Sequence, residues 1–135
     1  MFYNILFFRI IVYLWSKIKV MKVLKAYNVE IWVGLKECYQ DDKVHTIDDV
    51  RKICDEWVNK VKDCITIIPT EFRYVDGNET GVIVGYINYP RFPRTRKEIR
   101  RRALRLGEIL MTELRQYKVT ITTPYKSYML ENPFL

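Results

Sequence analysis

Residues 27–35 alternate between apolar and polar or small side chains, and this alternation limits the fold more than any other feature of the sequence. Successive side chains of a strand point to opposite faces, so a strict period of two indicates a strand with one face in a core. The other face carries Trp32. The apolar positions are Tyr27, Val29, Ile31, Val33 and Leu35.

A helix is expected at residues 47–62. Apolar side chains recur there at helical spacing on one side, and charged side chains lie opposite. Thr46 stands three residues before Asp49, which is the spacing of a capping box at a helix start. The apolar positions are Ile47, Val50, Ile53, Cys54, Trp57, Val58 and Val61.

Residues 64–89 have the pattern of a β-hairpin, because β-branched and aromatic runs flank the turn signal at residues 76–78. Pro69 cannot donate a hydrogen bond to a ladder, so its strand is expected to lie at an edge of the sheet or to be bulged at that point. The second arm is apolar on both sides, with Val82, Val84 and Tyr86 on one and Ile83, Ile87 and Tyr89 on the other.

A second helix is expected at residues 96–116, where Thr95 and Glu98 have capping-box spacing. A last strand at residues 119–123 ends at Pro124, and the tail is expected to form a loop or a short edge pairing. The apolar stripe of the helix consists of Ile99, Ala103, Leu106, Leu110, Leu114 and Tyr117.

The succession of elements predicts an α+β fold, a two-layer βαββαβ sandwich of the ferredoxin-like kind. Two helices would cover one face of a four-stranded antiparallel sheet. A chain of 135 residues has room for one ordinary core, so residues 22–135 are expected to form a single domain.

Residues 1–21 form an apolar and basic N-terminal leader, expected to be helical. The apolar run from Phe2 to Trp15 would span about 21 Å as a helix, less than the ~30 Å hydrocarbon core of a bilayer. Three interpretations remain: a membrane-surface anchor through residues 2–15, a helix packed on the domain or a partner, or sequence upstream of a true start at Met21.

Three segments resemble small uncharacterised proteins of bacteriophages and related mobile elements. They are EIWVGLKE at residues 30–37, FRYVDGNE at residues 72–79 and GVIVGYINYPRFP at residues 81–93. The resemblance covers residues 27–131 and implies a strand, a helix, a hairpin and a second helix in that order. It implies no activity and no catalytic residue.

The net charge of +7 is concentrated in residues 91–105, which hold eight Lys or Arg against Glu98. Arginines next to a helix start favour phosphate and other anions, because the guanidinium binds in a bidentate way and the backbone N–H groups add to the attraction. The sequence therefore predicts an anion site at this helix start. Its candidate ligand-binding residues are Tyr86, Tyr89, Arg91, Arg94, Arg96, Lys97 and Arg101.

Motifs of known catalytic and metal sites are missing from the sequence: it contains no GxGxxG, Walker, GxSxG or HExxH pattern. The three cysteines match no zinc spacing and are expected to be free thiols. His45 is the only histidine, and a loop or cap position suits it better than a general base. We therefore expect no catalytic residue, no metal and no cofactor.

These observations favour a small non-enzymatic binding module, viral or mobile-element in origin and cytoplasmic, that binds a nucleotide or phosphate-bearing partner. The alternatives are a sequence-tolerant nucleic-acid-binding protein and an enzyme of unrecognised type that joins Glu30, His45 or a tyrosine to the arginines. The helix-free face of the sheet would expose Trp32 and apolar residues of the hairpin. A homo-oligomer through this face is therefore expected.

Overall fold

The computed structural model describes residues 2–18 and 21–135. The parts of the leader predictions that concern Met1, Lys19 and Val20 lie outside these residues. The elements are α1 (Phe2–Ile18), β1 (Val29–Gly34), the 3₁₀ turn η1 (Glu37–Tyr39), α2 (Ile47–Val61), β2 (Thr66–Tyr74), β3 (Gly77–Tyr86), α3 (Arg96–Glu113), β4 (Lys118–Thr122) and β5 (Ser127–Glu131).

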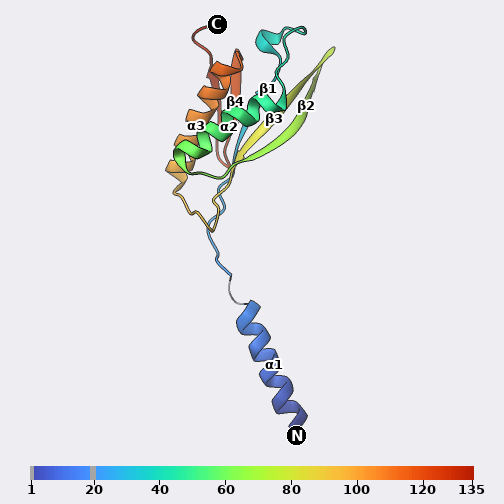
Figure 1. The fold of residues 1–135 in the computed structure, drawn as a ribbon, viewed down its shortest axis with the longest axis vertical. Coiled ribbons are helices and arrows are strands. Elements are labelled where there is room, and N and C mark those ends of the chain that lie inside the picture. The colour runs from blue at the N-terminus through green and yellow to red at the C-terminus, as the bar shows by residue number, and fades with distance from the viewer. Residues whose placement is uncertain (1, 19–20) are drawn as a thin grey trace.

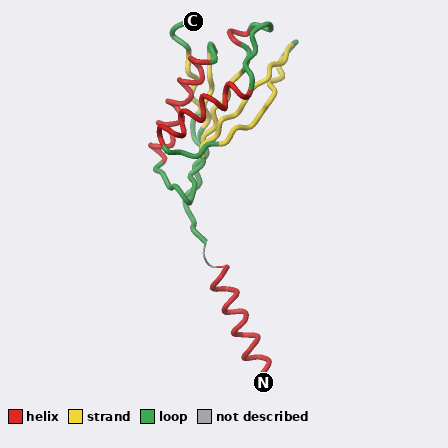
Figure 2. Tube along the Cα trace, in the orientation of Figure 1, coloured by secondary structure: helices red, strands yellow, loops and turns green. Residues whose placement is uncertain are grey.

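The strands form one sheet in the order β2-β3-β1-β4-β5, and every neighbouring pair is antiparallel. Helices α2 and α3 form the second layer (Figures 1 and 2). The predicted two-layer α+β sandwich is confirmed, with β1 as the central strand of its sheet. The strand that carries Pro69 lies at an edge, as its sequence predicts. The tail adds a fifth strand to the four expected, because residues 127–131 pair with β4.

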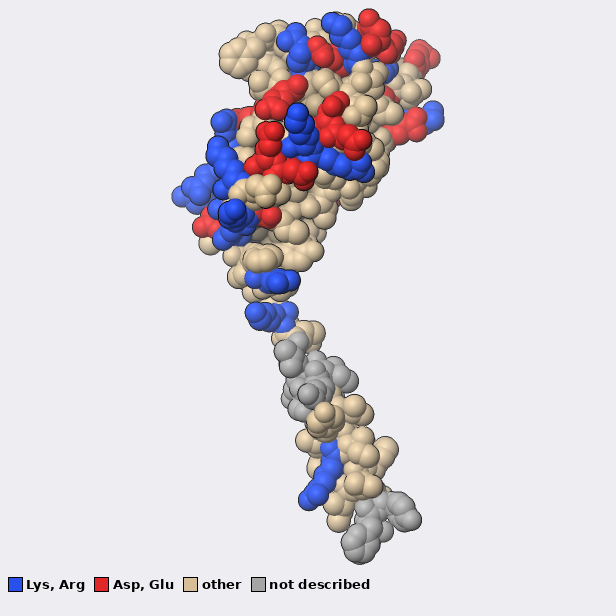
Figure 3. All heavy atoms as spheres, viewed as in Figure 1, with Lys and Arg blue, Asp and Glu red and all other residues tan. Residues whose placement is uncertain are grey.

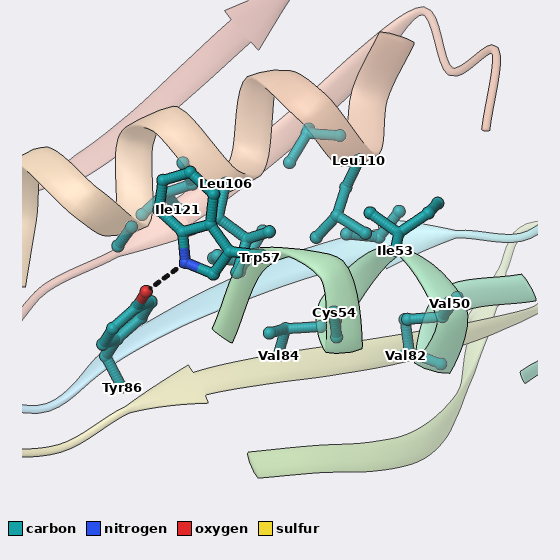
Figure 4. Packing of buried hydrophobic residues seen from close by; sticks show 14 of the residues in the cluster. Val50, Ile53, Cys54, Trp57, Val82, Val84, Tyr86, Leu106, Leu110 and Ile121 are labelled. Carbon is teal, nitrogen blue, oxygen red and sulfur yellow. Dashed lines mark hydrogen bonds between the residues drawn. The ribbon is translucent and has the colours of Figure 1, made fainter. Parts of the chain in front are cut away.

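The core lies between the sheet and the two helices. The alternating residues of β1 are all buried there, and Ile31 pairs with Val84 of β3 on one side and Ile121 of β4 on the other. Of the two apolar sets on the hairpin, the set of Val82, Val84 and Tyr86 faces the helices. Figure 4 shows these residues packed against Val50, Ile53, Cys54 and Trp57 of α2 and Leu106 and Leu110 of α3.

Both predicted helix starts are present. Thr46 Oγ1 accepts a hydrogen bond from Asp49 N at 3.2 Å, and Asp49 Oδ2 accepts one from Thr46 N at 2.9 Å, which completes the capping box of α2. Thr95 Oγ1 accepts from Glu98 N at 3.2 Å at the start of α3. These caps satisfy N–H groups that have no partner within the helix.

Helix α3 ends three residues before the predicted position 116. Arg115 has a φ of 49°, in the left-handed region, and Gln116 N donates to Met111 O at 2.9 Å, so the chain turns out of the helix there. Tyr117, expected on the apolar stripe, lies beyond the helix with 40% of its surface exposed. Its placement on the stripe was wrong.

Helix α1 extends away from the sheet and the two other helices (Figure 1). Within residues 2–18 and 21–135, no helix combines the length and the hydrophobicity needed to cross a bilayer. The three cysteines are free, as expected from their spacing.

Candidate functional site

The face of the sheet opposite α2 and α3, called the open face below, has no helix on it among the described residues. The strand register places the even-numbered residues of β1 and the odd-numbered residues of β3 there. Ile68 of β2 is 51% exposed and Met129 of β5 is 58% exposed. The open face carries Glu30, Trp32, Ile68, Phe72, Glu79, Ile83, Thr120, Thr122 and Met129.

Two aromatic rings lie near the middle of the open face. Trp32 is held in place because its Nε1 donates to Thr122 Oγ1 at 3.1 Å across β1 and β4. The ring centroids of Trp32 and Phe72 are 6.4 Å apart. The Phe72 ring lies directly over Gly81, since a Cβ built on that glycine would be 2.2 Å from Phe72 Cε2. A side chain at position 81 would therefore displace the ring.

A buried carboxylate lies at the end of the same face. Glu79 is only 7% exposed, and its Oε1 accepts a hydrogen bond from Lys36 N at 3.1 Å. The carboxylate lies against the backbone of Gly34, where a Cβ would be 2.3 Å from Oε1 and 3.1 Å from Gln116 Oε1. We call Gly34, Lys36, Glu79 and Gln116 the Glu79 cluster.

The amide of Gln116 fixes the surroundings of this carboxylate. Its Nε2 donates to Lys36 O at 2.8 Å and to Leu114 O at 3.0 Å, which links the ends of β1 and α3. Asn132 Nδ2 donates to Gln116 O at 3.1 Å from the other side. Burial, followed by the charge of Glu79, raises the pKa of the nearby Tyr39 hydroxyl.

This arrangement suits a cationic ligand better than an anionic one. A carboxylate removed from water gains most from a positive partner, because the attraction between the two charges is strongest where water is excluded. The faces of aromatic rings also attract cations, and Trp is the strongest of them. Glu30, Trp32, Phe72 and Glu79 present these two kinds of group on one face.

The arginines of residues 91–105 lie away from the open face, and some of them have partners within the protein. Asp63, whose side chain is 6% exposed, receives Arg102 Nη1 at 2.6 Å and Arg94 Nη2 at 3.6 Å. The Arg96 guanidinium lies 5.4 Å from the ring centroid of Tyr125, and that of Arg91 lies 5.5 Å from the centroid of Phe92.

The remaining candidate residues are spread over different surroundings. Tyr86 is buried: its hydroxyl accepts from Trp57 Nε1 at 2.5 Å (Figure 4) and donates to Asp63 Oδ2 at 3.1 Å, and burial raises its pKa. Tyr89 lies with Arg94 near a small hollow beside Asp63. Lys97 and Arg101 are exposed on α3, where Figure 3 shows basic side chains along the edge of the domain.

His45 lies at the opposite end of the sheet from the arginine-rich segment. Its backbone N donates to Leu35 O at 2.8 Å, and its ring lies 3.4 Å from Glu37 Oε2 and 3.5 Å from Asp49 Oδ2. It therefore does not join those arginines in a common pocket. Across the described ranges, no group of His, Cys, Asp and Glu is placed to hold a metal ion.

Glu79 was not a candidate residue in the sequence. A weak signal existed, because the period of two in residues 79–86 puts it on the same face as Ile83, opposite the buried valines. The burial of Glu79 depends on its contact with Gly34, which lies 45 positions earlier in the chain. No local sequence pattern includes both residues.

Two solved structures of a phage SAM lyase share this fold. The first, in complex with S-methyl-5′-thioadenosine, has a TM-score of 0.71 at 17% identity, and the match covers 87% of this chain and 99% of that chain. The second, in the apo state, has a TM-score of 0.71 at 16% identity with the same coverage. No family model and no curated protein matches the sequence.

These neighbours overturn the prediction of a non-enzymatic module, because both are lyases. The ligand in one of them is a nucleoside thioether without a phosphate group, and the predicted anion site stays a prediction. The prediction relied on the local charge of residues 91–105, but several of those arginines have partners within the protein. The sequence resemblance to phage proteins is supported in its coarse form, because the structural neighbours are phage proteins.

The substitution Gly34→Ala should destabilise the protein by about 1–3 kcal/mol, because the new Cβ displaces the Glu79 carboxylate from its hydrogen bond with Lys36 N. The cost should shrink markedly in a Glu79→Ala background, as a chemical-denaturation double-mutant cycle would measure. Gly85→Ala, whose Cβ meets only the Thr66 side chain closely, is the matched control and should cost the same in both backgrounds. An unchanged cost for Gly34→Ala would contradict the proposed contact.

Proposed function

We propose that this protein is a lyase that acts on S-adenosylmethionine and releases S-methyl-5′-thioadenosine. The observation that carries the proposal is the fold match with a phage SAM lyase in complex with S-methyl-5′-thioadenosine, which extends over 99% of that chain. The same match and the sequence resemblance support an origin in a phage or related mobile element.

The proposed reaction follows from the two molecules. The sulfonium of S-adenosylmethionine carries a methyl group, the adenosyl group and a four-carbon amino acid. Breaking the bond from sulfur to the four-carbon group leaves the electron pair on sulfur, which becomes the neutral thioether. A lyase adds no water. Either the fragment's own carboxylate oxygen attacks the γ-carbon and forms a lactone, or a base removes a proton from the neighbouring β-carbon and a double bond forms.

The open face supports this proposal through its charge and its aromatic rings. S-Adenosylmethionine presents two positive groups, a sulfonium and an ammonium, and an adenine ring. Glu79 and Glu30 supply carboxylates for the positive groups, and Trp32 and Phe72 supply ring faces for a cation or for adenine. Glu79 is our candidate for the carboxylate that faces the cation, because it is already shielded from water.

We further propose that a second copy of the chain covers the open face and completes the site. A shallow sheet face gives a small ligand only one wall, whereas small-molecule sites bury most of their ligand's surface. Ile68 and Met129 are more than half exposed on this face, next to the partly buried Trp32, Phe72 and Ile83. Burying such side chains between copies favours association by about 25 cal/mol per Å² of apolar surface.

The activity is tested by incubating the purified protein with S-adenosylmethionine and measuring S-methyl-5′-thioadenosine by liquid chromatography and mass spectrometry. We expect its release, and a loss of at least about tenfold in kcat/KM in Glu79→Gln, because the variant cannot balance the positive charge of the ligand. Glu71→Gln is the matched control: Glu71 is an exposed strand residue paired with Arg73, and the change should leave the rate unaltered.

The four-carbon product distinguishes the two routes. A lactone indicates attack by the carboxylate on the γ-carbon, and an alkene indicates loss of a proton. No thioether above the uncatalysed background would refute the proposed activity. Equal loss in the Glu71 and Glu79 variants would refute the assignment of Glu79 and leave the activity standing.

The proposed assembly is tested by multi-angle light scattering on the full chain and on Ile68→Asp. We expect the parent to be oligomeric and the variant to shift towards the monomer, because a charge on the open face must lose its water in the interface. Val75→Asp changes an exposed residue at the hairpin tip and should leave the mass unchanged. A monomeric parent, or equal masses for all three proteins, would contradict the assembly.

A further inference from the structure

Helix α1 exposes large apolar side chains over most of its length. Ten of them have between 36% and 67% of their surface exposed. Contiguous apolar surface of this extent is rare on soluble monomeric proteins and marks a surface that another component covers. The side chains are Ile5, Leu6, Phe7, Phe8, Ile10, Ile11, Val12, Tyr13, Leu14 and Trp15.

The distribution of these side chains favours lipid over a helical partner. Successive residues of an α-helix are about 100° apart, so the runs 5–8 and 10–15 reach every side of the helix. A partner helix requires an apolar stripe at spacings of three and four with polar residues opposite. Helix α1 has no such polar side between residues 5 and 15, where Arg9 is the only charged residue. An apolar medium, unlike a single partner helix, can contact all sides of α1.

The charge next to the helix indicates that anionic lipids are favoured. The first acidic residue of the chain is Glu30, and before it the sequence carries Arg9, Lys17, Lys19, Lys22 and Lys25. Lys22 and Lys25 are exposed on the segment that joins α1 to β1. Clusters of lysine beside an apolar helix are attracted to the phosphate groups of anionic lipids.

The length of α1 limits how it can enter a bilayer. Its 17 residues span about 25 Å, less than the ~30 Å hydrocarbon core. We infer that α1 and the basic segment after it bind the surface of an anionic membrane and hold the α+β domain there. This inference is independent of the proposed activity, because it rests on residues outside the open face.

The inference is tested by sedimenting the full chain with phosphatidylcholine vesicles and with vesicles of phosphatidylcholine and phosphatidylglycerol. We expect binding to both, stronger to the anionic vesicles and weakened by salt. Phe7→Asp combined with Ile11→Asp should lower the partition coefficient at least about tenfold on both vesicles, because a carboxylate is strongly disfavoured in hydrocarbon. Val75→Asp, at an apolar site of the domain that is 90% exposed, should bind as the parent does.

A second variant keeps the apolar helix intact. Lys22→Glu combined with Lys25→Glu should lose several-fold in binding to the anionic vesicles and little on pure phosphatidylcholine. Circular dichroism of each variant verifies that the domain remains folded. A parent that stays in the supernatant with both vesicles would overturn the inference. Vesicle binding that is unchanged by the Phe7 and Ile11 substitutions would also overturn the inference. So would light scattering that shows the helix only joining copies of the chain to one another.

Discussion

The alternation of side chains along β1 is the constraint on which the rest of the structure depends. The strand pairs with β3 along one edge and β4 along the other, so neighbours on both sides hold its register. Its odd-numbered residues are buried under α2 and α3, and its even-numbered residues form the middle of the open face. A shift of one residue would exchange the two sets, exposing Ile31 and burying Glu30. The core therefore fixes the position of Trp32 and Gly34, and through Gly34 the position of the Glu79 carboxylate.

Positive and negative side chains are also divided between the helix-covered side of the sheet and the open face. Basic side chains gather along α3 (Figure 3). Asp63 forms ion pairs with Arg94, which precedes this helix, and with Arg102 within it. The carboxylates of Glu30 and Glu79 lie on the other face, beside aromatic rings. A sulfonium substrate would be repelled by the first surface and attracted by the second, since both effects follow from the sign of the charge. The net charge of the chain therefore says little about the charge of its proposed ligand.

Local sequence patterns were enough to predict most of the fold. The period of two predicts β1, and the capping residues Thr46 and Thr95 predict both helix starts. Pro69 indicates the edge position of β2. The end of α3 was missed because the backbone of Arg115 turns there without a glycine or proline to signal it. The proposed site on the open face was not predicted from the sequence for a different reason. The hydrogen bond from Lys36 N to Glu79 and the ion pair of Arg102 with Asp63 join residues 43 and 39 positions apart, which no window of sequence compares.

We propose that the open face, and not the arginine-rich helix start, holds the nucleoside. Titration of the full chain with S-methyl-5′-thioadenosine, followed by amide and indole chemical shifts in ¹H–¹⁵N NMR spectra, tests it most directly. We expect saturable shifts of the Trp32 Nε1–H and of the Gly34 and Gly81 amides, with the amides of residues 96–101 unmoved. Shifts confined to residues 91–101, or no shifts at saturating ligand, would contradict it.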